Sequence, residues 1–267
     1  MIDGDIITYK CGFAVEKSKY LVWAKGEEHF GPIAIYRYKR GIPWWYSEDS
    51  DCVVEKVTEV ESLENCLQTV KTLIKSILDN TKTNEYSTYL SGKDNFREKI
   101  AKTKPYKGNR DPLHKPKYYN EIKDYLINTW GATVVDGIEA DDALGIAQTN
   151  DISSIICSID KDLDQIEGWH YNIDKKVKYW VTKEDGIKKF YTQLLTGDVV
   201  DNIQGVKGIG PKTAEKLFKD CKSEYDYYKV CCNQYKDNVL LTEMAQLLYI
   251  HKKENDEWEP PNDDSRD

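Results

Sequence analysis

The spacing of apolar residues along the chain predicts helices that alternate with strands. Apolar residues three and four positions apart predict a helix over residues 62–81, which begins at Ser62, and further helices over residues 117–130 and 183–195. Short apolar runs predict strands over residues 86–90, 132–135 and 152–159. This alternation is typical of an α/β protein built around a mostly parallel sheet.

The first sixty residues have a different pattern. Residues 20–24 and 33–38 predict the two strands of a hairpin, separated by Gly26 and a Gly-Pro turn. The cluster Trp44-Trp45-Tyr46 could stack on bases or pack against this hairpin, and packing is the more frequent use of such residues. Residues 169–181 predict a second hairpin, at an edge of the sheet.

Acidic residues gather at the start of one predicted helix and directly after the strand that follows it. Glu139, Asp141 and Asp142 open a helix in which Glu139 and Asp142 share one face, and Asp160 and Asp162 follow the apolar strand after it. Open α/β sheets bind ligands at the carboxyl ends of strands, and densely packed carboxylates repel each other unless a cation lies among them. The pattern therefore predicts a divalent metal site, although Glu139 or Asp141 alone could merely complement the helix dipole.

Composition narrows the class of protein. The formal net charge is −8, no basic-then-apolar leader opens the chain, and no apolar stretch reaches the roughly 18 residues of a membrane span. The seven cysteines form no CxxC pair, which argues against a disulfide framework and against a zinc ribbon. We expect a soluble cytoplasmic protein that does not enter a membrane.

One segment is basic in this acidic chain. Residues 93–123 carry ten Lys or Arg and only four acids, with aromatic residues between the cations. Prolines and glycines interrupt any long helix there. The segment could be a solvated charged face, but a long cationic and aromatic insertion between strands is more often functional, and phosphate binding would explain it.

A glycine-rich hairpin follows the helix predicted over residues 183–195. It contains Gly205, Val206, Lys207, Gly208, Ile209 and Gly210, and Pro211, Lys212 and Thr213 open the next helix. The glycines permit turns that side chains would forbid, and proline suits a first helical turn. Backbone N–H groups and two lysines of such a hairpin can bind a DNA phosphate. The spacing of a nucleotide-binding P-loop fails, because Pro211 separates the glycine from the lysine.

Four motifs in this order resemble the flap endonuclease and 5′-3′ exonuclease family, above all the bacteriophage 5′-nucleases and the 5′-nuclease domain of bacterial DNA polymerase I. The motifs are Tyr106-Lys107-Gly108-Asn109-Arg110, Glu139-Ala140-Asp141-Asp142, Asp160-Lys161-Asp162 and the stretch 197–214. The resemblance covers residues 86–220 and, more weakly, the first ten residues.

The resemblance implies a PIN-like α/β nuclease domain over residues 1–182, with a central, mostly parallel sheet flanked by helices and a basic arch at about 92–117. It implies a helical DNA-binding region over residues 183–252, with a helix-three-turn-helix at about 198–219. The remaining residues, 253–267, form an acidic tail that we expect to be disordered.

The resemblance also implies roles for single residues. Two Mg²⁺ ions, which Mn²⁺ can replace, would be held by Asp3, Glu139, Asp141, Asp142, Asp160, Asp162, Asp198 and Asp201. Lys107 and Arg110 would contact the scissile phosphate, and Tyr106 would stack on a base. DNA would contact Arg97, Gly205, Lys207, Gly208, Gly210, Lys212 and Thr213, and the helix-three-turn-helix could also bind K⁺.

Two departures from the family concern metal ligands. Relatives usually carry an aspartate directly after the strand that precedes the basic segment, whereas this chain has Ser91-Gly92, and Asp94 is the nearest acid. Relatives also have several more apolar residues before the first aspartate, so the first strand is very short here. Asp5 could share the role of Asp3.

Together these features predict Mg²⁺-dependent, two-metal hydrolysis of DNA phosphodiesters, as a 5′-3′ exonuclease or a flap endonuclease in replication or DNA processing. The substrate would be duplex DNA with a 5′ end or flap, or an RNA/DNA hybrid. We expect the protein to act as a monomer in the cytoplasm of a bacterial or phage-infected cell, in contact with replication proteins.

Two alternative functions stay open. The missing acid near Ser91 favours a non-catalytic DNA-structure-binding protein, and a PIN-like ribonuclease would share the acidic edge without needing the glycine hairpin.

Overall fold

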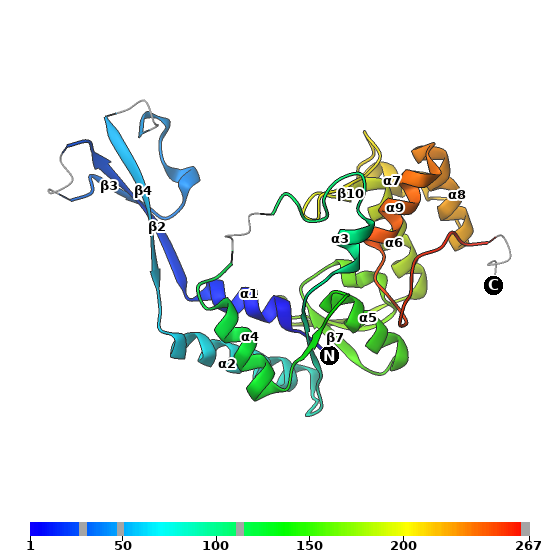
Figure 1. Ribbon diagram of the computed structural model, residues 1–267, viewed down its shortest axis with the longest axis horizontal. Coiled ribbons are helices and arrows are strands. Elements are labelled where there is room, and N and C mark those ends of the chain that lie inside the picture. Colours follow the sequence, from blue (N-terminus) through cyan, green and yellow to red (C-terminus); the bar gives the residue numbers. More distant parts are fainter. Residues whose placement is uncertain (27–30, 47–50, 111–114, 263–267) are drawn as a thin grey trace.

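A six-stranded sheet forms the centre of the protein (Figure 1). The computed structural model describes residues 1–26, 31–46, 51–110 and 115–262. In spatial order the strands are β6 (Thr133–Val135), β5 (Thr88–Ser91), β1 (Ile2–Asp3), β7 (Ile155–Ser158), β8 (Gly168–Asn172) and β9 (Val177–Val181). Neighbours from β6 to β8 are parallel, and β9 pairs antiparallel with β8 as the predicted edge hairpin. The mostly parallel sheet predicted from the sequence is confirmed.

Strand β1 is only two residues long, yet it lies between β5 and β7. Ile2 pairs with Thr88 on one side and with Cys157 on the other. The ammonium group of Met1 donates a hydrogen bond to the Ile155 carbonyl (2.6 Å), and the Cys157 N–H donates to the Met1 carbonyl (2.8 Å). These bonds hold Asp3 at the carboxyl edge of the sheet.

Helices cover both faces of the sheet. Helices α1 (Gly4–Ala14), α2 (Leu63–Thr81) and α4 (Tyr119–Trp130) pack together over one face, and α5 (Ala140–Asn150) packs over the other. Successive side chains of β7 point to opposite faces of the sheet. Cys157 packs in the core under α1, α2 and α4, and Ile156 packs in the core under α5. The Ser62 hydroxyl caps α2 as predicted, by accepting a hydrogen bond from the Asn65 N–H (3.2 Å).

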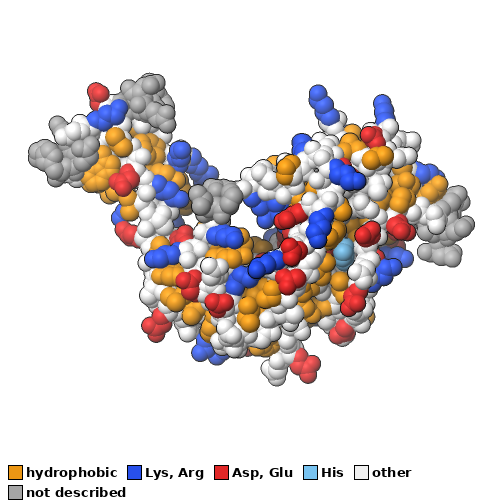
Figure 2. All heavy atoms as spheres, in the orientation of Figure 1, with side chains coloured by type: hydrophobic (Ala, Val, Ile, Leu, Met, Phe, Trp, Pro, Cys, Tyr) orange, Lys and Arg blue, Asp and Glu red, His pale blue; other side chains and the backbone are white. Residues whose placement is uncertain are grey.

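A three-stranded antiparallel sheet projects from this body and is called the arm (residues 16–26, 31–46 and 51–60). Its strands are β2 (Glu16–Ala24), β3 (Ala34–Tyr36) and β4 (Cys52–Val60), in the order β3-β2-β4. Figures 1 and 2 show the arm standing away from the rest of the molecule across a hollow. The hairpin of β2 and β3 was predicted, whereas β4, which pairs with β2 over nine residues, was not.

The aromatic cluster of the arm lies in the short helix η3 (Trp44–Tyr46), which follows η2 (Lys39–Gly41). The Tyr46 ring packs 6.4 Å from the Tyr36 ring of β3, in agreement with the packing interpretation. The Trp45 side chain is 57% exposed.

The C-terminal part forms a helical lobe with its own core. Its helices are α6 (Lys183–Thr196), α7 (Pro211–Leu217), α8 (Glu224–Tyr235) and α9 (Asn238–Leu248), and the short strands β10 (Gly197–Asp198) and β11 (Ile203–Gln204) join α6 to α7. Two short helices, α3 (Phe96–Ile100) and η4 (Asp162–Gln165), complete the described chain. Within the described ranges, no helix is long and apolar enough to cross a membrane.

The prediction of a disordered tail from residue 253 onward is wrong for its first part. The Trp258 side chain is only 4% exposed, and its ring lies 6.1 Å from those of Phe190 and Tyr228. Asp256 accepts hydrogen bonds from the Tyr249 hydroxyl (3.0 Å) and the Lys252 N–H (2.8 Å). A large aromatic side chain therefore anchors this acidic segment to the helical lobe, while residues 263–267 lie outside the described residues.

Candidate functional site

Carboxylates from distant parts of the sequence meet at the carboxyl edge of the sheet. Asp3 ends β1 and is 1% exposed. Its carboxylate accepts hydrogen bonds from the Ile6 N–H (2.9 Å) and the Ser158 hydroxyl (2.7 Å). Burial and the charges of Asp5 and Asp160 outweigh these bonds and raise the pKa of Asp3 to about 7.

The same repulsion extends to Asp141, in the first turn of α5, and to Asp160, which follows β7. Burial and the charges of Asp3, Asp160 and Glu139 raise the pKa of Asp141. Burial and the charges of Asp162 and Asp201 raise the pKa of Asp160. The site is therefore rich in negative charge that hydrogen bonds only partly offset, which is the situation that a bound cation relieves.

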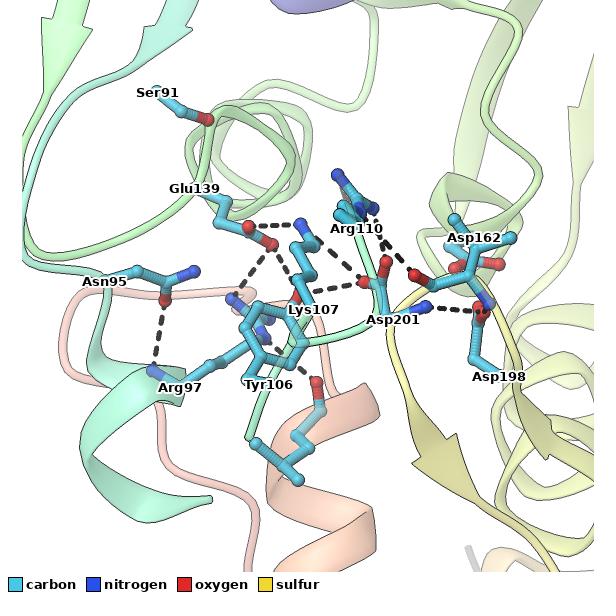
Figure 3. Close-up of polar contacts among 12 residues, drawn as sticks. Ser91, Asn95, Arg97, Tyr106, Lys107, Arg110, Glu139, Asp162, Asp198 and Asp201 are labelled. Atoms are coloured by element: carbon cyan, nitrogen blue, oxygen red, sulfur yellow. Dashed lines mark hydrogen bonds and ion pairs between the residues drawn. The ribbon is translucent and has the colours of Figure 1, made fainter. Parts of the chain in front are cut away.

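Residues 105–110 of the basic segment lie against these acids (Figure 3). The Tyr106 hydroxyl lies 2.9 Å from carboxylate oxygens of both Glu139 and Asp201. The Lys107 ammonium pairs with Glu139 and lies 3.7 Å from Asp201, and the Arg110 guanidinium pairs with Asp201. The structure thus brings the three residues expected to act on phosphate next to the acids expected to bind metal.

Backbone contacts fix this segment to the β10–β11 hairpin. The Lys107 N–H donates to the Asp201 carbonyl (2.9 Å), and the Asn202 side-chain amide donates to the Pro105 carbonyl (2.9 Å). The Asn109 amide donates to the Val199 carbonyl (2.6 Å). The segment therefore links the helical lobe to the α/β body.

The surrounding acids keep Tyr106 and Lys107 protonated. Burial and the charges of Glu139 and Asp201 raise the pKa of the Tyr106 phenol strongly. Burial lowers the pKa of Lys107, but the charges of Glu139 and Asp201 outweigh burial and raise it. The sequence suggested that Tyr106 stacks on a base, whereas in this structure its hydroxyl bridges two carboxylates.

Asp142 and Arg97 require a correction, because they pair with each other in the interior. Both Arg97 terminal nitrogens donate to the Asp142 carboxylate (2.6 and 2.8 Å), and the side chains are 3% and 0% exposed. Arg97 also donates to the carbonyls of Leu247 (2.9 Å) and Tyr249 (2.6 Å). A buried guanidinium that is held by four hydrogen bonds cannot reach DNA, so the DNA-contact expectation for Arg97 is wrong in this structure.

Asp142 likewise differs from the expected metal ligand. Its carboxylate also accepts hydrogen bonds from the Glu139 N–H (3.0 Å) and the His251 N–H (3.1 Å). Burial raises the pKa of Asp142, but the hydrogen bonds and charge of Arg97 outweigh it and hold the pKa below its usual value. Glu139 contacts Lys107 and Tyr106 directly and lies 3.7 Å from Arg97, so the two acids of the predicted face share Arg97, but only Asp142 is hydrogen-bonded to it.

The remaining predicted ligands lie near the site with partners of their own. Asp162 pairs with Lys189 (3.1 Å), and its N–H donates to the Asp160 carboxylate (2.8 Å). Asp198 accepts hydrogen bonds from the N–H groups of Val200 (2.7 Å) and Asp201 (3.1 Å). Asp162 and Asp198 therefore help to position Asp160 and Asp201.

Asp5 lies next to Ser91, the position at which relatives usually carry an aspartate and this chain does not. One Asp5 carboxylate oxygen accepts a hydrogen bond from the Ser91 N–H (3.1 Å), and the Ser91 hydroxyl accepts one from the Ala140 N–H (2.9 Å). The other oxygen, Oδ1, is buried and has no hydrogen-bond partner among the residues that the structure describes. The alternative acid, Asp94, is exposed. An acid two residues after Asp3 was the only sequence signal for this arrangement.

The acids at this edge have the oxygen donors of a magnesium site, but they are not arranged around one point. Across the described parts of the chain, no group of three or more His, Cys, Asp or Glu side chains is arranged to hold a metal ion. Lys107 lies between Glu139 and Asp201, Arg110 pairs with Asp201, and the two cations offset the charge of these acids. The donors are nevertheless carboxylate oxygens, which Mg²⁺ prefers, and Asp5 Oδ1 is a buried oxygen in need of a partner.

The glycine hairpin has the backbone that its sequence predicts. A Cβ on Gly205 would lie 2.3 Å from the Thr196 carbonyl carbon, and Gly208 has a φ of +85°. Val206 and Ile209 pack against the core of the helical lobe, and Pro211 opens α7. The side chains that the hairpin exposes include Lys207, Lys212 and Thr213.

Comparisons with known proteins agree with the resemblance seen in the sequence. No family model matches the chain. The chain is 33% identical over 165 residues to the flap endonuclease Xni of Shewanella pealeana, which covers 54% of this chain and 64% of that protein. It is 31% identical over 166 residues to the 5′-3′ exonuclease of Buchnera aphidicola, which covers 54% of this chain and 52% of that protein.

A third relative is the DNA polymerase I of Borreliella burgdorferi, 31% identical over 136 residues, or 45% of this chain and 14% of the polymerase. The chain thus spans less than two thirds of the length of each of these relatives, from 14% to 64%. The resemblance to 5′-3′ exonucleases, flap endonucleases and DNA polymerase I is confirmed at the level of sequence similarity.

Solved structures agree in fold. A flap endonuclease of bacteriophage T5, solved as a pseudo-enzyme–product complex with DNA and metal ions, matches with a TM-score of 0.55 at 18% identity, over 68% of this chain and 79% of that one. A T5 5′-exonuclease with bound zinc matches with a TM-score of 0.53 at 19% identity, over 67% and 79% of the two chains. The mixed α/β fold with a mostly parallel central sheet flanked by helices is shared with these proteins.

Proposed function

We propose that the chain is a divalent-metal-dependent 5′-nuclease that hydrolyses phosphodiester bonds of DNA. The observation that carries this proposal is the meeting of Asp3, Asp141 and Asp160 at one sheet edge, with Asp201 of the β10–β11 turn, Lys107 and Arg110 beside them. The names of the relatives, 5′-3′ exonuclease and flap endonuclease, support the reaction class. The T5 complex with DNA and metal ions supports both the substrate and the cofactor.

Carboxylates would hold the two Mg²⁺ ions, and Mn²⁺ could replace them. The proposed ligands are Asp3, Glu139, Asp141, Asp160 and Asp201, with Asp5 in place of the acid that is missing at Ser91. Divalent ions supply activation of water and charge stabilisation for phosphodiester hydrolysis. Asp142 is left out, because Arg97 saturates it.

The protein's own cations would act on the phosphate. Lys107 and Arg110 can turn from their carboxylate partners to the phosphate oxygens and offset the negative charge that develops there. A well-placed donor of this kind is worth about 2.7–4 kcal/mol. Tyr106, held protonated between Glu139 and Asp201, would fix the position of this segment relative to the acids.

Duplex DNA would bind the helical lobe. In this proposal residues 1–182 form the nuclease domain, residues 183–252 the DNA-binding region, and residues 198–219 a helix-three-turn-helix that could also hold K⁺. Exposed Lys207, Lys212 and Thr213, together with the backbone at Gly205, Gly208 and Gly210, would contact the phosphate backbone. A 5′ single strand would reach the acids past residues 105–110. The protein would act as a monomer alongside replication proteins.

Cleavage of 5′-labelled flapped duplex tests the proposal. The wild type should cut in Mg²⁺ and stop in EDTA, and Asp160→Asn should lower turnover by at least about 100-fold, as removal of a transition-state contact does. Asp164→Asn is the matched control, because Asp164 accepts a hydrogen bond from Tyr179 (2.7 Å) and lies only four residues further along. Near-normal turnover by Asp160→Asn, or cutting that persists in EDTA, would refute the assignment.

A non-catalytic DNA-binding protein is the second candidate. Ser91 in place of an acid favours it, as does the absence of a ready metal cluster among the described residues. Retained binding of flapped DNA without any Mg²⁺-dependent cutting by the wild type would support this candidate. Preference for single-stranded RNA over duplex DNA would instead indicate a ribonuclease.

A further inference from the structure

A cationic pocket lies on the arm, away from the acidic edge. The pocket has a volume of about 370 Å³, and its lining includes Lys17, Arg37, Lys39, Lys56, Tyr38 and Glu16. Four cations and a single acid therefore line a hollow in a chain whose net charge is −8. Such a local excess of positive charge is not needed to fold a three-stranded sheet, and it attracts anions.

Within the described part of the chain, only one of the four cations of this pocket forms an ion pair. Lys17 pairs with Glu61 (2.7 Å), but Arg37, Lys39 and Lys56 have no acidic partner among the residues that the structure describes. The guanidinium carbons of Arg37 and Arg40 lie 5.3 and 5.4 Å from the centre of the Tyr38 ring, so one aromatic side chain organises two cations. Of these two arginines Arg37 lines the pocket, together with Lys39, and Arg40 lies on the same ring just outside the lining.

The pocket continues the basic segment of the nuclease body. Its one acid, Glu16, accepts a hydrogen bond from the Lys117 N–H (2.6 Å), which ties the arm to the end of that segment. The Lys115 ammonium lies 4.6 Å from the centre of the Tyr119 ring, next to this junction. Figure 2 shows Lys and Arg side chains on the part of the arm that faces the hollow of the molecule.

We infer that the cationic pocket of the arm binds the phosphodiester backbone of the DNA substrate, at a distance from the acids that cut it. The inference rests on the proposed function, because a substrate that passes the basic segment comes next to the Glu16–Lys117 junction. The pocket offers three lysine ammonium groups and the guanidinium of Arg37, which suit phosphate oxygens, and these contacts would read no base.

The test measures how DNA affinity depends on salt. Arg37→Gln/Lys39→Gln removes two charges from the pocket. Lys71→Gln/Lys75→Gln is the matched control, because it removes two exposed charges from α2 and gives the same net charge. The probe is a fluorescein-labelled duplex with a single-stranded 5′ flap, bound in EDTA and followed by anisotropy between about 50 and 200 mM salt.

Loss of two phosphate contacts should make the slope of log affinity against log salt shallower by about 1.8, and the control should keep the wild-type slope. Turnover at saturating DNA in Mg²⁺ should stay unchanged. Arg37→Lys/Lys39→Arg should keep the wild-type slope, which separates loss of charge from loss of the arm's fold. A slope for Arg37→Gln/Lys39→Gln equal to that of the control would overturn the inference.

The outcomes also separate this inference from the proposed function. If the wild type cuts flapped DNA but the pocket variant binds with an unchanged slope, only the arm inference fails. If the wild type neither binds nor cuts DNA, both fail together. A loss of affinity seen for single-stranded RNA but not for flapped DNA would show that DNA is the wrong partner for the pocket.

Discussion

The ion pair between Arg97 and Asp142 gives the sharpest test of the structure. Arg97→Met keeps most of the side-chain volume but leaves the buried Asp142 carboxylate without its cation. It also removes the donors to the Leu247 and Tyr249 carbonyls. Breaking a buried pair by removing one partner costs about 3–5 kcal/mol. Domains are typically stable by only about 5–15 kcal/mol, so the variant should unfold at a clearly lower urea concentration.

Two further variants isolate the pair. Lys99→Met removes an exposed cation two residues away on the same helix, α3, and should change stability by less than about 0.5 kcal/mol. Arg97→Met/Asp142→Leu removes both buried charges, and should recover much of the stability lost in Arg97→Met, because no uncompensated charge remains. The coupling between the two positions follows from the double-mutant cycle.

Urea unfolding followed by circular dichroism measures these differences, and anisotropy of flapped DNA below the unfolding transition measures binding. Arg97→Met that retains folding should bind DNA about as well as Lys99→Met does. The reasoning would be refuted by a loss of stability below about 1 kcal/mol together with a large loss of DNA affinity. That result would make Arg97 the DNA contact that the sequence suggested.

Three further predictions concern other parts of the chain. Lys107→Ala should lower turnover by about 10²–10³-fold with less effect on duplex affinity, and equal losses in both would make Lys107 only an anchor. Trp258→Ala should cost about 3–5 kcal/mol in urea unfolding, because its ring is packed in the core of the helical lobe; a loss below about 1 kcal/mol would contradict that packing. Asp226→Asn should destabilise the protein at neutral pH. Hydrogen bonds from the N–H of Lys222 and from Ser223 lower the pKa of Asp226 to about 2. The stabilisation is therefore present above the unfolded pKa of about 3.9 and is lost as pH falls through about 2. Melting temperatures of the wild type and the variant that still differ below about pH 2 would contradict this prediction.

Periodicity predicted the elements that bury a whole face. Helix α2 places Val70, Ile74 and Ile77 in the core, and its stripe and cap are both visible in the sequence. Strand β4 could not be found in this way, because most of its side chains are exposed and charges interrupt its valines. A strand that is stabilised by pairing with β2 rather than by a buried face leaves no alternating pattern to detect.

The site was predictable in its residue types but not in all of its pairings. Spacing placed Glu139 and Asp142 on one face, yet Arg97, far away in sequence, decides that Asp142 turns inward. In a capping box, the third residue of a helix accepts a hydrogen bond from the backbone N–H of the residue that precedes the helix. Asp142 is the third residue of α5 and accepts this bond from Glu139, so the sequence could have identified it as a cap. Trp258 was likewise a visible sign of order in a segment assigned to disorder from its charge.

The ion pairs at this site differ in how exposed their side chains are, and this difference affects which pairs can separate when substrate binds. Arg97 and Asp142 are almost fully buried, so separating them is expensive and the pair should persist. Lys107 is 25% exposed and Arg110 is 48% exposed, so solvent screens their ion pairs more than it screens the pair of Arg97 and Asp142. These two cations can therefore leave Glu139 and Asp201 for phosphate oxygens at a lower cost than Arg97 could leave Asp142. The acids that they release are those proposed to bind divalent ions, so binding of phosphate and binding of metal should favour each other.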